Sequence, residues 1–359
     1  MAVSDYRLNL VLRRDGVVLG DRELTAATAV EDALFRSVVA GDVDNDGVVP
    51  PIELTPRWHE LGEPIISGFD LGVAGTAVRS YKTDIYADQA RALTRWLVAD
   101  GKIDATQTGS PLRWHVEAEH RPRRSRARVV RKPFPLVPGR LEAAEPDAAP
   151  GSWTVALSDD VLAEIEDDVM ATPLCEVAGL LVGRVVHDVK QRMAQVQIGR
   201  YVVLPAGDGG ASHAHFDFGP TTFQSARRAL RELAPDATCT GWAHSHPACE
   251  GCPANPECRA QTVFFSEDDL RVHSSSFGAP FQVALVAGKI SNSPASRPGC
   301  AVFGWDHGAI ETQRFDVAGR AGGARQIAML ASADDDDRAA ALPPPEVGVA
   351  DDKKPLNHD

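Results

Sequence analysis

The segment Gly241-Trp242-Ala243-His244-Ser245-His246-Pro247 constrains the fold more than any other part of this chain. Its two histidines are separated by one residue. Side chains alternate between the two faces of a strand, so in an extended segment both imidazoles point to the same side. A strand predicted over Thr238–Trp242 would deliver them, and a single metal ion could then bind both rings.

A serine and an aspartate follow at a spacing that supplies a third ligand, in Ser266-Glu267-Asp268-Asp269. Serine is a favoured N-cap, so a helix beginning at Ser266 would place Ser266 and Asp269 one turn apart on the same face. Asp269 would complete three protein ligands and leave the fourth tetrahedral position to water, as in a catalytic zinc site. The spacing from Ser266 favours Asp269 over the adjacent Asp268.

Glu176 lies just before an apolar, glycine-flanked strand predicted at Gly179–Gly183. Zinc lowers the pKa of its water to about 7 and polarises a carbonyl, but hydrolysis still needs a proton acceptor. The fold could bring Glu176 over the metal as a general base, and then as an acid to the leaving amine, without making it a ligand. The hydroxyl of Ser266 could donate to the developing oxyanion.

These motifs resemble those of the JAMM family of zinc metalloproteases, also called MPN-type or JAB proteins, over roughly residues 153–316. Every position of the family signature has a match: Glu176 in E-x-x-G-L-L-x-G, His244 and His246 before a proline, and Ser266 and Asp269 in S-x-x-D. The resemblance implies a cytidine-deaminase-like α/β fold, with a mixed sheet flanked by helices. It also implies hydrolysis of an isopeptide or peptide bond after the C-terminal tail of ubiquitin or a ubiquitin-like protein.

The leading hypothesis is therefore a zinc-dependent isopeptidase or protease that cleaves ubiquitin-like proteins from conjugates or precursors. The resemblance implies such a protein as partner and, by analogy alone, associated activating and conjugating enzymes. A non-catalytic MPN-like scaffold that binds protein partners is one alternative, although such members typically lose ligands and none is lost here. The second alternative is a zinc amidohydrolase that acts on a small substrate, because zinc chemistry fixes the reaction and not the substrate.

The chain departs from the family pattern between the two halves of the metal motif. The family leaves a short gap there, whereas 19 residues separate His246 from Ser266. They contain Cys249, Cys252 and Cys258, in which C-x2-C has zinc-ligand spacing and the prolines suit neither a packed helix nor a strand. One interpretation is a second, structural zinc or other metal, and the other is a flexible loop with free thiols or an adventitious disulfide. The fourth ligand would come from Cys239, His273, His213 or His215.

Residues 42–53 fit the EF-hand calcium-loop pattern D-x-D-x-D-G-x5-E. Calcium would be bound by Asp42, Asp44, Asp46, Val48 and Glu53, with Gly47 at the sharp turn. Against this interpretation, two prolines occupy the start of the exiting helix, and EF-hands normally come in pairs. Clusters of Asp, Asn and Gly are also ordinary turn chemistry. A calcium loop and a plain turn both remain open.

Composition limits the partners and the compartment. The net charge of −13 argues against a general nucleic-acid binder, because contacts to phosphates need net positive surface. Seven basic residues between Arg121 and Lys132 are the local exception, and a solvated linker explains them as well. No window approaches 18 uncharged apolar residues and no secretory leader is evident, so we expect a cytoplasmic protein without a membrane partner. Its six cysteines would then be thiols or metal ligands.

The length of 359 residues allows two domains and some disordered sequence. We predict an α+β accessory domain over 1–118, a linker over 119–151, the hydrolase domain over 152–320 and a disordered acidic, proline-rich tail over 321–359. Within the accessory domain we expect a hairpin over 6–19, helices near 30–40 and 87–99 with mixed turns between them, and a closing strand at 112–116. The hydrolase domain should contain a helix after Ser158, one from 221 or 222 and one from Ser266, and strands at 179–186, 194–203, 238–242, 281–287, 301–305 and 310–315.

Overall fold

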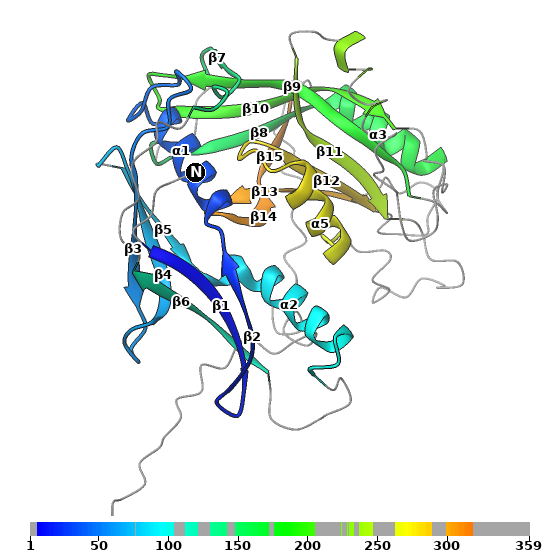
Figure 1. Cartoon of the computed structure of the whole chain (residues 1–359). Helices are drawn as coiled ribbons and strands as arrows, with labels where there is room; N and C mark the ends of the chain where they lie inside the picture. Colours follow the sequence, from blue (N-terminus) through cyan, green and yellow to red (C-terminus); the bar gives the residue numbers. More distant parts are fainter. Residues whose placement is uncertain are drawn as a thin grey trace, which may run out of the picture.

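The computed structural model describes residues 6–75, 77–103, 112–120, 130–141, 148–171, 176–204, 224, 228, 230–232, 237–246, 263–288 and 299–318. These residues form a six-stranded and a nine-stranded sheet with a few helices (Figure 1). The fold is therefore mixed α/β and consists mostly of sheet.

The first sheet is antiparallel and comes from the N-terminal part of the chain. Its strands follow the order β2-β1-β6-β4-β3, and β5 pairs with β4. In β1, Leu8, Leu10 and Leu12 lie on one face of the strand and turn toward the core; Asn9 between them is half-exposed, whereas Val11 is buried as well. The bounds are β1 Tyr6–Arg14, β2 Val17–Leu24, β3 Ile52–Trp58, β4 Ile65–Val73, β5 Ala77–Lys82 and β6 Arg113–His120.

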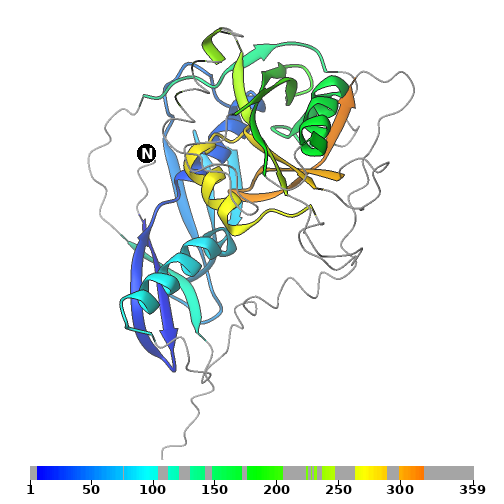
Figure 2. The same ribbon diagram turned by 90° about the vertical axis from the view of Figure 1, so that its right-hand side faces the viewer.

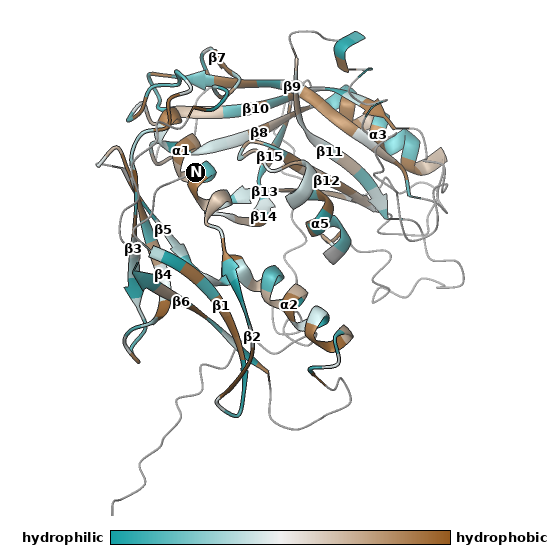
Figure 3. Ribbon diagram, in the orientation of Figure 1, coloured by the Kyte–Doolittle hydropathy of each residue, from teal (hydrophilic) through white to brown (hydrophobic). Residues whose placement is uncertain are grey.

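Two helices pack on this sheet, α1 (Ala27–Val39) against β4 and β5, and α2 (Ala87–Ala99) against β1 and β2. A short 3-10 helix, η1 (Thr83–Tyr86), leads into α2. Helix α2 buries Ala90, Leu93 and Leu97 at helical spacing, so apolar residues gather on one face and polar residues on the other (Figure 3). By contrast, β9 of the second sheet is apolar along much of its length, as expected for a strand covered on both faces.

The second sheet is mixed and has the order β14-β13-β12-β11-β9-β10-β8-β15, with β7 also paired to β9. One face of this sheet is covered by helix α3 (Asp159–Ala171) and the other by helix α5 (Glu267–Ser276), and each helix contributes to a separate apolar core. Ile165 of α3 shares one core with Leu181 of β9, whereas Phe277 after α5 shares the other with Leu180. The strands are β7 Leu136–Pro138, β8 Trp153–Ser158, β9 Ala178–Asp188, β10 Met193–Val203, β11 Thr238–His246, β12 Val283–Gly288, β13 Gly299–Asp306, β14 Ala309–Gln313 and β15 Phe315–Ala318.

The second sheet curves round so that its two ends meet. Only Arg314 separates β14 from β15 in the sequence, yet β14 pairs with β13 at one end of the strand order and β15 with β8 at the other. Figure 2 shows this curvature. The single strand expected at 310–315 is therefore two strands, because the chain changes partners at Arg314.

One apolar core joins the two sheets. Phe35 of α1 meets the ring of Phe134 at 5.1 Å between centroids and the ring of Phe281 at 6.0 Å. Phe134 and β7 lie within the predicted linker, but Phe134 is buried and β7 pairs in parallel with β9. Residues 130–141 are therefore part of the packed structure.

Several expected elements differ from the observed ones. Residues 52–82, expected as mixed turns, contain β3, β4 and β5. The helix expected from 221 or 222 lies largely outside the described residues, although 230–232 are helical, and the expected tail lies wholly outside them. Among the described helices, none has the length and apolar character needed to cross a membrane.

Candidate metal centre

Strand β11 lies between β9 and β12 in the second sheet and carries both histidines. A bulge between Cys239 and Gly241 shifts its register against β9. Gly241 has a φ of 148°, and a Cβ at this position would overlap the carbonyl oxygen of Val283. Glycine is thus required here. Beyond the bulge, the side chains of His244 and His246 point to the face on which α5 packs.

Helix α5 begins with a reciprocal cap that orients its aspartate. The hydroxyl of Ser266 accepts the backbone N–H of Asp269 at 3.1 Å, and the carboxylate of Asp269 accepts the backbone N–H of Ser266 at 2.7 Å. This capping box satisfies two N–H groups at the helix start. It also holds the Asp269 carboxylate at the end of α5 that faces β11.

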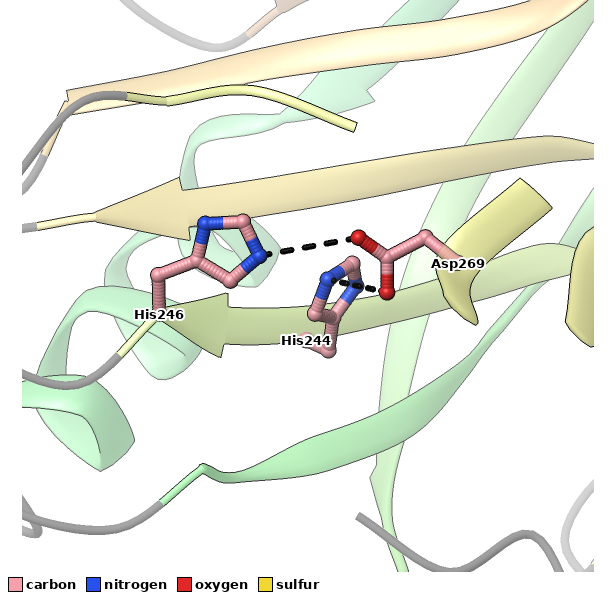
Figure 4. A group of neighbouring side chains, drawn as sticks. All are labelled: His244, His246 and Asp269. Carbon is pink, nitrogen blue, oxygen red and sulfur yellow. Dashed lines mark ion pairs between the residues drawn. The ribbon is translucent and has the colours of Figure 1, made fainter. Parts of the chain in front are cut away.

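The three predicted ligands converge. Figure 4 shows the carboxylate of Asp269 directed at both rings, with Oδ1 3.0 Å from Nε2 of His244 and Oδ2 3.6 Å from Nε2 of His246. All three side chains are buried. Among the described residues they form the one group of three or more metal-ligating side chains whose ligand atoms lie together, here within 4.8 Å of one another.

This geometry fits a zinc ion. Two imidazole nitrogens and a carboxylate oxygen are a usual zinc set, and bonds of about 2.0–2.2 Å at tetrahedral angles place ligand atoms about 3.3 Å apart. The observed separations of 3.0 and 3.6 Å lie on either side of that value. In addition, Nδ1 of His244 and Nδ1 of His246 are buried without a hydrogen-bond partner among the described residues. The residues present can therefore hold the ion.

Electrostatics favour the ligating forms of Asp269 and His244. Burial raises the pKa of Asp269, but hydrogen bonds and charge interactions with His244, His246 and Ser266 outweigh it and hold this pKa well below its ordinary value. Burial is also the main cause that lowers the pKa of His244. An ionised carboxylate and a neutral imidazole are the forms that bind a metal.

The predicted general base lies beside the site. Ala178 of β9 is the register partner of His244, and one residue further Ser245 N–H donates to the carbonyl oxygen of Val177 at 2.9 Å. Glu176 is two residues before Ala178 and lies just beyond the start of β9, at the end of the strand that adjoins the histidines of β11. Glu176 is partly exposed, as a group that meets substrate must be.

Two aromatic residues lie against the predicted ligands, and neither of them was predicted from the sequence to have a role at the site. The indole of Trp242 stacks on the imidazole of His244, with ring centroids 4.4 Å apart and planes at 13°. The ring of Phe264 lies 4.5 Å from that of His246. Trp242 was visible in the sequence motif at two residues before His244, but its contact with the ligand follows only from the strand geometry.

The second zinc site cannot be placed, because Cys249, Cys252 and Cys258 lie outside the described residues, as do His213 and His215. Two residues considered as its fourth ligand have other contacts. Nδ1 of His273 accepts a hydrogen bond from Trp242 at 3.1 Å, and Sγ of Cys239 donates to the carbonyl oxygen of Gly241 at 3.5 Å.

The loop of the calcium pattern has a different arrangement from an EF-hand. Asp42 pairs with Arg192 at 2.6 Å, and the carboxylate of Asp46 accepts the N–H of Val48 at 2.8 Å. Glu53 is exposed on β3 instead of beginning a helix. Asn45, within the loop, exchanges two hydrogen bonds of 2.8 Å with the backbone of Phe134. The loop thus joins α1 to β3. Among the described residues, its carboxylates do not form a metal-ligating cluster. The residues predicted to bind calcium were Asp42, Asp44, Asp46, Val48 and Glu53.

Comparisons with known proteins include two partial matches. No protein-family model matches the chain. The NAD(+) hydrolase TcpA of a Theionarchaea archaeon (strain DG-70-1) is 29% identical over 135 residues, which are 37% of this chain and 33% of that protein. The chain therefore spans about a third of the length of this curated relative. The solved structure of protein DSY2949 from Desulfitobacterium hafniense is 22% identical over 46% of this chain and 94% of that one, with a TM-score of 0.33, which is too low to define a shared fold.

Proposed function

We propose that this protein is a zinc-dependent hydrolase of the JAMM type that cleaves an isopeptide or peptide bond. The observation that carries the proposal is the buried convergence of His244, His246 and Asp269, with Glu176 two residues before Ala178, the register partner of His244. The mixed sheet flanked by α3 and α5 is compatible with the cytidine-deaminase-like fold that the resemblance implies.

When bound, zinc acts as a Lewis acid toward a carbonyl and makes water a nucleophile near neutral pH. Around it, Glu176 takes a proton from the attacking water and passes it to the leaving amine. Ser266 accepts the N–H of Asp269, so its own hydroxyl proton is available to donate to an oxyanion. The indole of Trp242 stacks on the imidazole of His244 and the ring of Phe264 lies tilted against that of His246, so each histidine has an apolar neighbour.

We further propose that the substrate is a ubiquitin-like protein, joined to a target or present as a precursor. The support is the match of all signature positions, from Glu176 to Asp269, to a family with that activity. A small amide substrate is the alternative, because the same groups would catalyse its hydrolysis. The similarity to TcpA covers 33% of that protein, so NAD⁺ hydrolysis is not carried over to this chain.

The test combines metal analysis with a cleavage assay. Purified protein should contain zinc and should cleave a ubiquitin-like protein fused through its C-terminal tail to a reporter. Asp269→Asn should lose zinc and cleavage together. Asp268→Asn is the matched control, since Asp268 is the exposed neighbour that pairs with Arg271 at 2.8 Å, and it should retain both. Zinc-loaded protein that hydrolyses small amides but no ubiquitin-like fusion would select the alternative substrate, and protein that binds no zinc would reject the proposal.

A further inference from the structure

Trp242 and His273 form a second link between β11 and α5, beside the metal ligands. Trp242 lies two residues before His244 on the strand, and His273 lies about one helical turn after Asp269 on the helix. Nε1 of Trp242 donates to Nδ1 of His273 at 3.1 Å. Strand and helix are therefore joined twice, once by the 3.0 Å approach of His244 to Asp269 and once by this buried hydrogen bond.

Packing orients the imidazole of His244. Histidines that bind metals usually donate their second ring N–H to a carboxylate or a carbonyl, which fixes the plane of the ring. Nδ1 of His244 has no such partner among the described residues. Instead, the indole of Trp242 stacks on the imidazole, nearly parallel to it. Because rotation of the imidazole would drive it into the indole, the position of Trp242 sets the direction of the His244 nitrogens.

His273 in turn holds the indole. A tryptophan nitrogen can only donate, so Nδ1 of His273 must be unprotonated to accept from it. His273 is completely buried among aromatic rings, and this burial lowers its pKa to about 3, so the ring remains a neutral acceptor at neutral pH. The rings around it are Phe265, Phe277 and Trp305, at centroid distances of 6.0, 6.1 and 5.5 Å.

We propose that Trp242 and His273 are positioning residues for the metal. Their hydrogen bond fixes the spacing between β11 and α5 and the plane of the His244 ring. It thereby sets the affinity and the geometry of the site formed by His244, His246 and Asp269. The inference rests on the metal binding proposed above, but neither residue touches the ion.

The test measures metal binding directly in the full-length chain. Metal-free protein is titrated with Zn²⁺ against a chromophoric chelator, and with Co²⁺ while its visible absorption is recorded. Trp242→Phe keeps a stacked ring and removes the donor. It should weaken affinity roughly 10- to 100-fold and change the Co²⁺ spectrum. Trp305→Phe is the matched control, because Nε1 of Trp305 donates to the carbonyl oxygen of Phe277 at 3.0 Å in the same core, and it should leave both unchanged.

A second pair of variants addresses His273. His273→Leu removes the acceptor and should reproduce the losses of Trp242→Phe, whereas His273→Gln restores an acceptor and should recover most of the affinity. Circular dichroism of each variant checks that it is folded. Equal losses in Trp242→Phe and Trp305→Phe, or wild-type affinity in His273→Leu, would overturn the inference. Wild-type protein that binds neither ion would overturn the proposed function instead, so the two failures are distinct.

Discussion

At the scale of single residues, Asp269 has two tasks in one carboxylate. It approaches both ligand imidazoles, and it accepts the backbone N–H of Ser266 at 2.7 Å. The proposed metal ligand and the helix cap are therefore the same group. Any movement of the start of α5 moves a ligand as well.

Glu176 is expected to act on water and not on the metal. Glu176→Gln should therefore keep its zinc while hydrolysis falls about 100- to 10,000-fold, the range typical for loss of a general base. Elemental analysis beside the fusion-cleavage assay measures both quantities. Glu164→Gln is the control, because Glu164 is an exposed carboxylate on α3. An active Glu176→Gln protein would contradict the assigned role.

His273 should make the metal-free protein less stable in acid. Burial lowers its pKa from the ordinary 6.5 to about 3. Between these values the unfolded chain binds a proton that the folded protein does not. The free energy of unfolding therefore falls as the pH drops from 6.5 toward 3, by at most about 1.4 kcal/mol per pH unit for this one group.

Urea unfolding at several pH values below 6.5 checks this dependence. His273→Gln should show a shallower slope than the wild-type protein, by up to one proton, whereas both should respond alike above pH 7. Coinciding slopes would mean that another group causes the acid sensitivity. His244, whose pKa burial also lowers, is present in both proteins and cancels in the comparison.

The ligands could be predicted from the sequence because their spacing is local. Because one residue separates His244 from His246, their side chains lie on the same face of a strand. Because Asp269 follows Ser266 by three residues, the two lie one helical turn apart. The contact between Trp242 and His273 could not be predicted in this way. It joins residues 31 positions apart and depends on how α5 packs on β11.

At the scale of elements, the cap of α5 should couple helix stability to metal binding. Ser266→Ala removes the side-chain half of the capping box and should cost about 1 kcal/mol of stability. Ser158→Ala is the matched variant, because the hydroxyl of Ser158 accepts the N–H of Val161 at 3.2 Å at the start of α3. Both should destabilise the protein in denaturant unfolding, but only Ser266→Ala should lower zinc affinity and hydrolysis. Equal zinc affinity in the two variants would contradict the coupling.

Elements with a regular pattern were predicted well and those without one were not. The helix expected near residues 87–99 is α2 at Ala87–Ala99, because its apolar residues repeat at helical spacing. Strands β3 to β5 were missed. β3 contains Pro56 and β4 contains two glycines, residues that are unfavourable inside a strand, so the pairing of these strands follows from their neighbours more than from local propensity.

At the scale of the whole molecule, the two sheets are joined by more than apolar packing. Arg36 of α1 binds Asp32 on its own helix at 3.0 Å and Asp306 at the end of β13 at 2.5 Å. The hydroxyl of Tyr81 donates to Asp32 at 3.2 Å. No sequence pattern predicts a pair of residues separated by 270 positions. The domain boundaries at 118, 151 and 320 remain predictions, drawn from composition, while the core that the sheets share appears only in three dimensions.

Arg36 should therefore be essential to the stability of the assembled chain. Asp32 is fully buried, so Arg36→Leu leaves its charge without a cationic partner. Removing one partner of a buried ion pair costs about 3–5 kcal/mol, and Asp32→Asn combined with Arg36→Leu should recover part of this loss. Arg228→Leu is the control, because the pair of Arg228 with Glu232 is exposed to solvent and should contribute little to stability. Denaturant unfolding of the full-length variants measures each effect, and an Arg36→Leu protein no less stable than Arg228→Leu would show that the ion pairs of Arg36 do not hold the sheets together.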